Sequence, residues 1–379
     1  MEGIAPFHVM ELMAKAQALE AQGRDIVHME VGEPDFPTPQ PVIDAAQRFL
    51  AGGHVHYTGA LGLPALREAI AGWYRTRYGI SIDPARIVVT AGASGALLLA
   101  LGALVSPGDE WLLADPGYPC NRHFVRFCEG VPRSLEVDAT TNFQPTAEKV
   151  GAGWTAHTKG LLVASPANPT GTMLEPAELA HLWQAVRARG GSLIVDEIYH
   201  GLTYGNDART ALEISDDILV VNSFSKYFGM TGWRLGWLVL PPGLVRTVEK
   251  LAQNLYIAPS TPAQHAALAA FAPETIAILE VRREAFRRRR DLLLPGLAAL
   301  GFRIGAEPRG AFYVYADIGD LAEDSFELAG RLIAQGGVAA TPGLDFGAHA
   351  PHRFMRFAYT VAEERLAEGL VRMTDLFRC

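Results

Sequence analysis

One lysine stands in an unusual setting, within the segment NSFSKYFGMTGWRLGW (222–237). Lys226 directly follows Ser225, with Ser223 shortly before it and Arg234 eight residues after it. Hydroxyls and a guanidinium suit the oxygens of a phosphate, and arginine can bind such an anion with two donors. The segment therefore predicts a reactive amine beside an anion site, although turn-capping serines and an arginine in a surface ion pair would explain the same residues.

Further candidate groups follow other short apolar segments. Asp196 ends the segment SLIVD (192–196), where a partly buried carboxylate needs a partner. A protonated ring nitrogen would suit it, whereas a metal ion would need more ligands and no histidine cluster accompanies it, so we predict no metal. Tyr199 carries a phenol that can donate, and Asn168 in SPANPTG offers an amide, although NPTG is also typical of a tight turn.

Three more motifs complete the set of candidates. Tyr118 lies in DPGYP, where its ring could stack on a planar ligand or fill the core. Arg356 in FMRFAY has apolar neighbours and needs an anion, either a ligand carboxylate or an internal ion pair. GASGA (92–96) opens a helix whose free N–H groups favour phosphate, or else Ser94 simply caps it.

Taken together, these groups fit one ligand. It has a phosphate, an aromatic ring with a nitrogen and a phenolic oxygen, and an aldehyde for an amine, which describes pyridoxal phosphate carried on a lysine. The chain contains neither the Gly-x-Gly-x-x-Gly fingerprint nor a P-loop, so a nicotinamide oxidoreductase is not predicted.

The elements that must position these groups are predicted from apolar runs separated by helical periods. Runs buried on both faces and alternating with helices indicate a mostly parallel sheet covered by helices, hence an α/β fold. The seven predicted strands are 86–90, 110–114, 133–137, 160–164, 192–196, 218–222 and 234–240. Five of the polar motifs follow such strands, and ligands of open α/β sheets bind beyond the carboxyl ends of the strands.

The pattern changes toward the end of the chain. A long helical region after residue 243 is followed by GFRIGAEPRGAFYVYADI and HRFMRFAYTV, predicted as antiparallel strands around a helix at 325–336. We expect an N-terminal segment (1–40) that contributes to the small domain and to dimer contacts, a large cofactor-binding domain (41–290) and a small α+β domain (291–379).

Composition excludes several classes of protein. The 379 residues are 49% apolar and 20% charged, which is typical of a globular protein, and a net charge of −8 argues against a nucleic-acid partner. The basic run RREAFRRRR (282–290) is predicted to be a solvated or ion-paired helix face. Cys120, Cys128 and Cys379 give no disulfide framework, and no signal peptide or membrane-spanning segment is evident, so we expect a cytoplasmic protein.

The ordered motifs resemble those of one family, the class I/II (fold-type I) pyridoxal-phosphate-dependent aminotransferases, in the branch that includes bacterial aspartate aminotransferases. The resemblance runs from VGEPDFPTP and HYTGALGLPALREAI through SPANPTG, IVDEIY and NSFSKYFGMTGWRLGW to ATPGLDFG and MRFAY. It implies a large domain with a seven-stranded, mostly parallel sheet and a smaller α+β domain.

The resemblance also implies a role for each candidate residue. Lys226 would form the Schiff base, with Asp196 on the pyridine nitrogen, Tyr199 and Asn168 on the phenolic oxygen, and Tyr118 stacked on the ring. The phosphate cup would consist of Ala93, Ser94, Ser223 and Arg234, with Ser225 nearby. Arg356, together with Asn168, would hold the substrate α-carboxylate close to the backbone of Gly32. Tyr57 would reach a phosphate in the neighbouring subunit, so a homodimer with shared active sites is implied.

The same resemblance predicts transfer of an amino group from an L-amino acid to a 2-oxo acid, 2-oxoglutarate or pyruvate, by a ping-pong mechanism. Ser94 stands where some bacterial aspartate enzymes carry a lysine, and we find no second arginine for a side-chain carboxylate. Ile4, Phe7 and His8 are expected near the substrate, so a neutral or aromatic donor is favoured. A carbon–sulfur or other β-elimination lyase and a non-catalytic binding protein of the same fold remain as alternatives.

Overall fold

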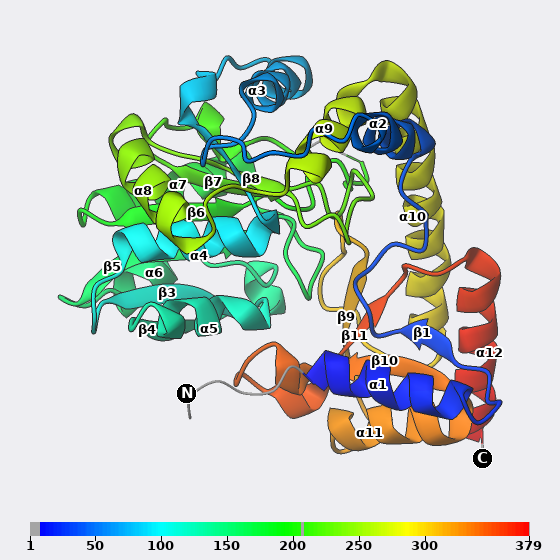
Figure 1. The fold of residues 1–379 in the computed structure, drawn as a ribbon. Coiled ribbons are helices and arrows are strands. Elements are labelled where there is room, and N and C mark those ends of the chain that lie inside the picture. Colours follow the sequence, from blue (N-terminus) through cyan, green and yellow to red (C-terminus); the bar gives the residue numbers. More distant parts are fainter. Residues whose placement is uncertain (1–7, 206–207, 379) are drawn as a thin grey trace.

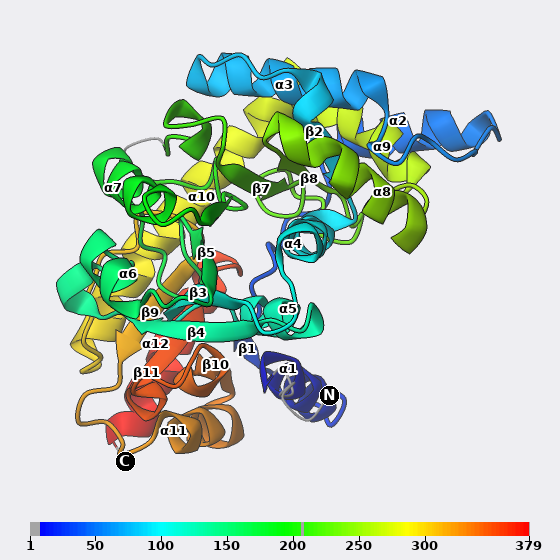
Figure 2. The same ribbon diagram turned by 90° about the vertical axis from the view of Figure 1, so that its left-hand side faces the viewer.

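Two sheets organise the molecule, a computed structural model that describes residues 8–205 and 208–378. One has seven strands and the other four. Figures 1 and 2 place the four-stranded sheet, with helices α1 and α11, at one end of the molecule and helix α3 at the opposite end. Among the helices of the described residues, none is long and apolar enough to cross a membrane.

The larger sheet confirms the predicted α/β architecture. Its order is β2-β8-β7-β6-β5-β3-β4, and every neighbouring pair is parallel except the two made by β8. The strands are β2 (Ile87–Thr90), β3 (Glu110–Asp115), β4 (Val131–Glu136), β5 (Thr158–Ala164), β6 (Ser192–Asp196), β7 (Leu219–Ser223) and β8 (Gly236–Val239). All seven predicted strands are present, although β8 is shorter than predicted because Arg234 adopts a positive φ of 52° in the preceding turn.

The sheet is buried on both faces because both sets of alternating side chains are apolar. In β5, Leu161 and Val163 join one hydrophobic cluster, while Leu162 joins the cluster on the opposite face. Helices that contribute residues to the first cluster include α2 (Gln40–Ala51), α3 (Pro64–Tyr78), α6 (Ala147–Gly153), α7 (Pro176–Arg187), α9 (Thr261–Leu268) and α10 (Pro273–Ala299), and the cluster extends to helices beside the smaller sheet. Those in the second are α4 (Gly92–Leu104), α5 (Pro119–Phe127) and α8 (Val245–Leu255).

The smaller sheet joins the two ends of the chain. Its order is β1-β10-β11-β9, and β1 is parallel to β10 whereas the other pairs are antiparallel. The antiparallel pairing of β9 with β11 was predicted, but β10 was not predicted as a strand. Its strands are β1 (Val27–Met29), β9 (Tyr313–Asp317), β10 (Val338–Pro342) and β11 (Phe354–Ala358), and the neighbouring helices are α1 (His8–Glu20), α11 (Ser325–Arg331) and α12 (Glu363–Arg378). Because α10 runs across the expected boundary at residue 290, the exact domain limits stay a prediction.

The arginine-rich part of α10 is an ion-paired helix face, as predicted. Arg287 pairs with Glu284 and Asp291 on its own helix. Arg289 is buried and binds both oxygens of Asp35, at 2.8 and 2.9 Å. This bidentate pair ties α10 to the loop that follows β1, and that loop carries Gly32.

Candidate active site

A cavity of about 370 Å³ lies at the carboxyl edge of the larger sheet, between the strand ends and the smaller sheet. Eleven of the thirteen predicted site residues line it: Gly32, Ala93, Ser94, Tyr118, Asn168, Asp196, Tyr199, Ser225, Lys226, Arg234 and Arg356. Parallel strands end at the same edge, so motifs far apart in sequence converge there.

Two predicted residues lie elsewhere. Ser223 is buried behind the cavity wall, where its Oγ lies 2.9 Å from Ser225 Oγ and 3.0 Å from the carbonyl oxygen of Leu235. Ser225, rather than Ser223, therefore presents its side chain to the cavity. Tyr57 is 81% exposed and lies outside the cavity, so its predicted role toward a neighbouring subunit stays a prediction.

Lys226 follows β7 and projects its amine into the cavity. Its Nζ donates a hydrogen bond to the carbonyl of Gly32 at 2.6 Å and lies 5.6 Å from the centre of the Phe312 ring. Burial lowers the pKa of this amine to about 8, and the charges of Arg356 and Arg234 act in the same direction. A substantial fraction of the amine is therefore neutral near physiological pH, as a nucleophile or proton acceptor must be.

Asp196 is the last residue of β6 and is 5% exposed. Its Oδ1 accepts a hydrogen bond from the backbone N–H of Ile198 at 3.1 Å. Burial raises the pKa of this carboxyl to about 7, against the opposing effects of that bond and of Lys226. A buried acid balanced near neutrality is well suited to a ligand that supplies a cationic N–H group.

The start of α4 and the side chain of Arg234 together present hydrogen-bond donors to the cavity. The helix begins at Gly92 without a side-chain cap, so the N–H groups of Ala93 and Ser94 have no partner within the helix. Gly92 has a φ of +71°, and a Cβ there would lie 2.6 Å from Nη2 of Arg234, so only glycine lets the guanidinium approach this closely. With Ser225 beside them, these donors suit a phosphate group.

Among the described residues, the hydrogen-bond partners of Arg356 are all neutral groups. Nη1 donates to Oδ1 of Asn168 at 3.0 Å, and Nη2 donates to the carbonyl of Glu30. The guanidinium also lies 4.4 Å from the ring centre of Tyr313 and 4.9 Å from that of Phe346, while its buried Nε has no hydrogen-bond partner. A charged arginine held this way is ready to bind a carboxylate, which favours the ligand interpretation over an internal ion pair.

Sequence reasoning missed several residues of the wall. The hydroxyl oxygens of Tyr313, on β9, and Tyr199 lie 3.0 Å apart and share a hydrogen bond in which either hydroxyl can be the donor. A Cβ on Gly32 would lie 1.9 Å from the Tyr313 hydroxyl, so the glycine in VGEPDF is required by this contact. Glu33 accepts from the Thr231 hydroxyl at 2.6 Å at the cavity mouth. The motif GAFYVY indicated a strand near the site, but which side chain faced inward depended on the pairing of that strand.

Two residues of the N-terminal helix that were not predicted line the cavity. Val9 and Met10 line the cavity, whereas His8 does not; its imidazole Nδ1 lies 3.0 Å from Glu11 Oε2. Ile4 and Phe7 lie outside the described residues. Val9 and Met10 thus make an apolar contribution to the wall, while the expectation for Ile4 and Phe7 stays a prediction.

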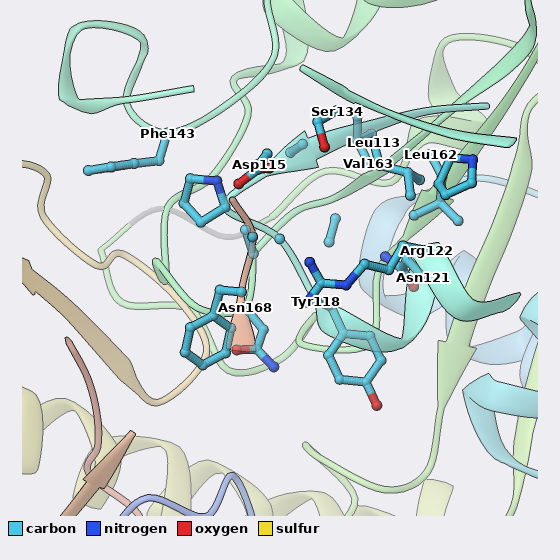
Figure 3. Close-up of a pocket in the computed structure, with 18 of the residues that line it drawn as sticks. Leu113, Asp115, Tyr118, Asn121, Arg122, Ser134, Phe143, Leu162, Val163 and Asn168 are labelled. Atoms are coloured by element: carbon cyan, nitrogen blue, oxygen red, sulfur yellow. The ribbon is translucent and has the colours of Figure 1, made fainter. Parts of the chain in front are cut away.

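A second cavity, of about 230 Å³, adjoins the first and shares Tyr118 and Asn168 with it. Figure 3 shows Tyr118 and Arg122, from the start of α5, at this cavity together with Asn168. Phe346 also lines it, so the second cavity lies between the loop after β3 and the segment that follows β10.

Comparisons with known proteins agree with this geometry. The family model for aminotransferase class I and II matches residues 24–373. The chain is 41% identical to a valine–pyruvate aminotransferase of Mycobacterium tuberculosis, over 98% of this chain and 96% of that protein.

Solved structures give the same result. An aminotransferase from Mycobacterium tuberculosis superposes with a TM-score of 0.96 at 39% identity, covering 100% of this chain and 98% of the other. An aspartate aminotransferase from Thermus thermophilus with maleate gives 0.94 at 37% identity, covering 99% and 98%. The fold-type I architecture is thereby confirmed, and the chain belongs to the class I and II aminotransferases, a family of pyridoxal-phosphate-dependent enzymes.

Proposed function

We propose that this aminotransferase takes its amino group from an L-amino acid with a neutral, apolar or aromatic side chain and passes it to 2-oxoglutarate or pyruvate in a ping-pong reaction. The observation that carries the proposal is the convergence of Lys226, Asp196 and Arg356 on one cavity. The apolar side chains of Val9, Met10 and Val31 on its wall support an apolar donor, as does similarity to a protein named for valine and pyruvate.

The residues of the cavity fit the family's cofactor. Asp196 would accept from the ring nitrogen, while the first turn of α4, Ser225 and Arg234 would hold the phosphate. When bound, pyridoxal phosphate supplies an aldehyde that takes the amino group and a protonated ring that draws electrons from the bond between Cα and its hydrogen. Asp196 would keep that ring nitrogen protonated, because a buried ionised carboxylate is stabilised by an adjacent positive charge.

The remaining residues would act on the substrate. Arg356 would bind the α-carboxylate with its guanidinium, displacing the weaker contact to Asn168. Tyr118 would stack above the ring, and Tyr199 would donate to the phenolic oxygen, since burial holds the pKa of Tyr199 well above its usual value and keeps it protonated. Lys226 Nζ would take the proton from Cα of the amino acid, which its lowered pKa of about 8 permits near neutral pH.

A homodimer is part of the proposal. Tyr57 is exposed in this chain together with Leu50 and Val55, and such a cluster of exposed apolar side chains is suited to contact with another subunit. Sedimentation of the purified protein tests this assembly, and a monomer that retains full activity would contradict a shared active site.

The decisive experiment adds amino acids one at a time to the protein loaded with pyridoxal phosphate, with no oxo acid present. Loss of the visible absorption band as pyridoxamine phosphate forms would establish the first half-reaction, and valine, phenylalanine and alanine should be more effective than aspartate. Release of ammonia and pyruvate with the band retained would instead favour the β-elimination lyase. A protein that binds the cofactor but converts none of the amino acids would favour the non-catalytic alternative.

A further inference from the structure

The first turn of α1 forms part of the wall of the larger cavity. Val9 is buried and Met10 is half exposed, and both line the cavity. The middle of the helix is fixed to the smaller sheet because Ala16 packs with Ile333 and Ala339. The position of the first turn relative to the cavity therefore depends on what holds the N-terminal end of this helix.

One carboxylate from the far end of the chain holds that end. Asp345 accepts a hydrogen bond from the backbone N–H of His8 at 2.9 Å on Oδ1 and from that of Val9 at 2.8 Å on Oδ2. The first N–H groups of a helix have no partner within the helix, and a carboxylate there also interacts favourably with the helix dipole. Asp345 is only 3% exposed, so its carboxylate is shielded from water while it accepts these two hydrogen bonds.

The same segment is bound to the residues around Tyr118. Arg122 donates from Nη2 to the backbone carbonyl of Asp345, and the N–H of Gly117 donates to the carbonyl of Phe346 at 2.8 Å. Gly117 and Arg122 lie on either side of Tyr118 in sequence, and Figure 3 shows Arg122 and Tyr118 together at the second cavity. Asp345 thus connects the first turn of α1 to the loop that carries the predicted ring-stacking residue.

We propose that Asp345 is a positioning residue: it holds Val9 and Met10 against the substrate side chain and thereby selects amino acids with branched or aromatic apolar side chains. This inference rests on the proposed function. A small side chain such as the methyl group of alanine gains little from that wall, whereas the side chains of valine and phenylalanine gain contact area in proportion to their size.

The test compares Asp345→Ala with the unmodified enzyme in two measurements. Amide hydrogen exchange should become about tenfold faster in the first turn of α1, as for loss of a helix cap. The KM for valine and for phenylalanine should rise about tenfold while the KM for alanine changes less than about twofold, because only the larger side chains use the wall.

Asp324→Ala is the matched control. Asp324 caps α11, where it accepts from the N–H of Phe326 at 2.6 Å, and no residue of α11 lines the cavity. This variant should leave all three KM values unchanged. Asp345→Asn keeps the shape of the side chain and one acceptor oxygen, so its effects should lie between those of the unmodified enzyme and Asp345→Ala.

Two results would overturn the inference. Unchanged exchange in the first turn of α1 would show that Asp345 does not hold it, whatever the catalytic activity. If amide exchange in the first turn of α1 became faster but the KM values for alanine, valine and phenylalanine changed equally, Asp345 would cap the helix without influencing which amino acid is selected. Failure of the proposed function is a separate result, because the unmodified protein would then convert none of these amino acids.

Discussion

The two sides of the larger cavity are built from the chain in different ways. On the sheet-edge side, which comprises Ala93, Ser94, Asp196, Ser225 and Lys226, each residue lies at the end of a strand or a few residues beyond it. On the small-domain side, which comprises Val9, Met10, Gly32, Tyr313 and Arg356, the contacts join segments from opposite ends of the chain.

This difference between the two sides suggests different roles: the sheet-edge side would carry out the chemical step, and the small-domain side would select the substrate. The sheet-edge side is fixed by a buried parallel sheet whose strands leave little freedom to the residues that follow them. The small-domain side combines residues of the smaller sheet with long-range contacts, such as that of Arg356 with the Glu30 carbonyl and that of Asp345 with the start of α1. Changes on the first side should remove a chemical step, and changes on the second should mainly alter substrate binding.

The largest effect is expected on the sheet-edge side, for Lys226→Ala. Loss of the amine that we propose transfers the proton should reduce kcat by at least about 10³-fold, and the visible absorption of lysine-bound cofactor should disappear. Lys250→Ala, at an exposed position on α8, is the matched control and should behave like the unmodified enzyme. A Lys226→Ala variant with the visible band and full turnover would remove this lysine from the mechanism.

On the small-domain side, Arg356→Lys should affect binding more than chemistry. Lysine keeps the positive charge but cannot form bidentate hydrogen bonds with a carboxylate. The KM for amino acids should therefore rise about 100-fold, with a smaller change in kcat. Arg353→Lys is the control, since Arg353 pairs with Asp317 at 2.7 Å on the surface. An unchanged KM in Arg356→Lys would contradict the assignment of the α-carboxylate to Arg356.

The next prediction concerns stability on the sheet-edge side. Burial raises the pKa of Asp196 from 3.8 to about 7 in the folded protein without cofactor. Between these two pH values, the carboxyl is therefore protonated in the folded protein but ionised in the unfolded chain. Its stability therefore falls as the pH rises through that window. Asp196→Asn should accordingly raise the free energy of unfolding at pH 8 by roughly 3 kcal/mol, measured by urea denaturation without cofactor.

The pH dependence provides the internal control for this variant. The gain from Asp196→Asn should shrink as the pH falls toward 3, where the carboxyl is protonated in the folded protein and largely so in the unfolded chain. A gain that is independent of pH would mean that the charge of Asp196 is not its source. With pyridoxal phosphate bound, the variant should lose this advantage, since the ring nitrogen compensates the charge.

The smallest effects should distinguish the two serines near Lys226. Ser225→Ala removes a hydroxyl on the cavity wall and should weaken cofactor binding about 30-fold, the range for a hydrogen bond to a charged group. Ser223→Ala removes contacts behind the cavity wall, with Ser225 at 2.9 Å and with the Leu235 carbonyl at 3.0 Å, and should weaken binding only about threefold. The reverse order, measured by equilibrium titration, would place Ser223 in direct contact with the phosphate.

Most of the sheet-edge side could be predicted because local sequence carries its signals. The run SLIVD shows a buried strand, and Asp196 at its end stands out as a charge among apolar residues. The resemblance placed both Ser223 and Ser225 at the phosphate, and residues two positions apart face the same side of an extended strand. Spacing alone did not decide between Ser223 and Ser225.

The small-domain side was predicted less completely. Arg356 was found because an arginine flanked by apolar residues is conspicuous, whereas Tyr313 lies in a run of aromatic residues that all fit a core strand. Val9 and Met10 were missed in favour of their neighbours Ile4, Phe7 and His8, since the amphipathic pattern of α1 does not show which turn meets the cavity.

By itself, the sequence determined the seven strands, their burial and the chemical groups at their ends, because apolar periodicity and isolated polar residues are local properties. Only the tertiary structure decided that Asp345 caps α1, that Gly32 lies against Tyr313 and that Arg356 has neutral partners. Those contacts join segments hundreds of residues apart in a chain of 379, and they exist only once both sheets have packed.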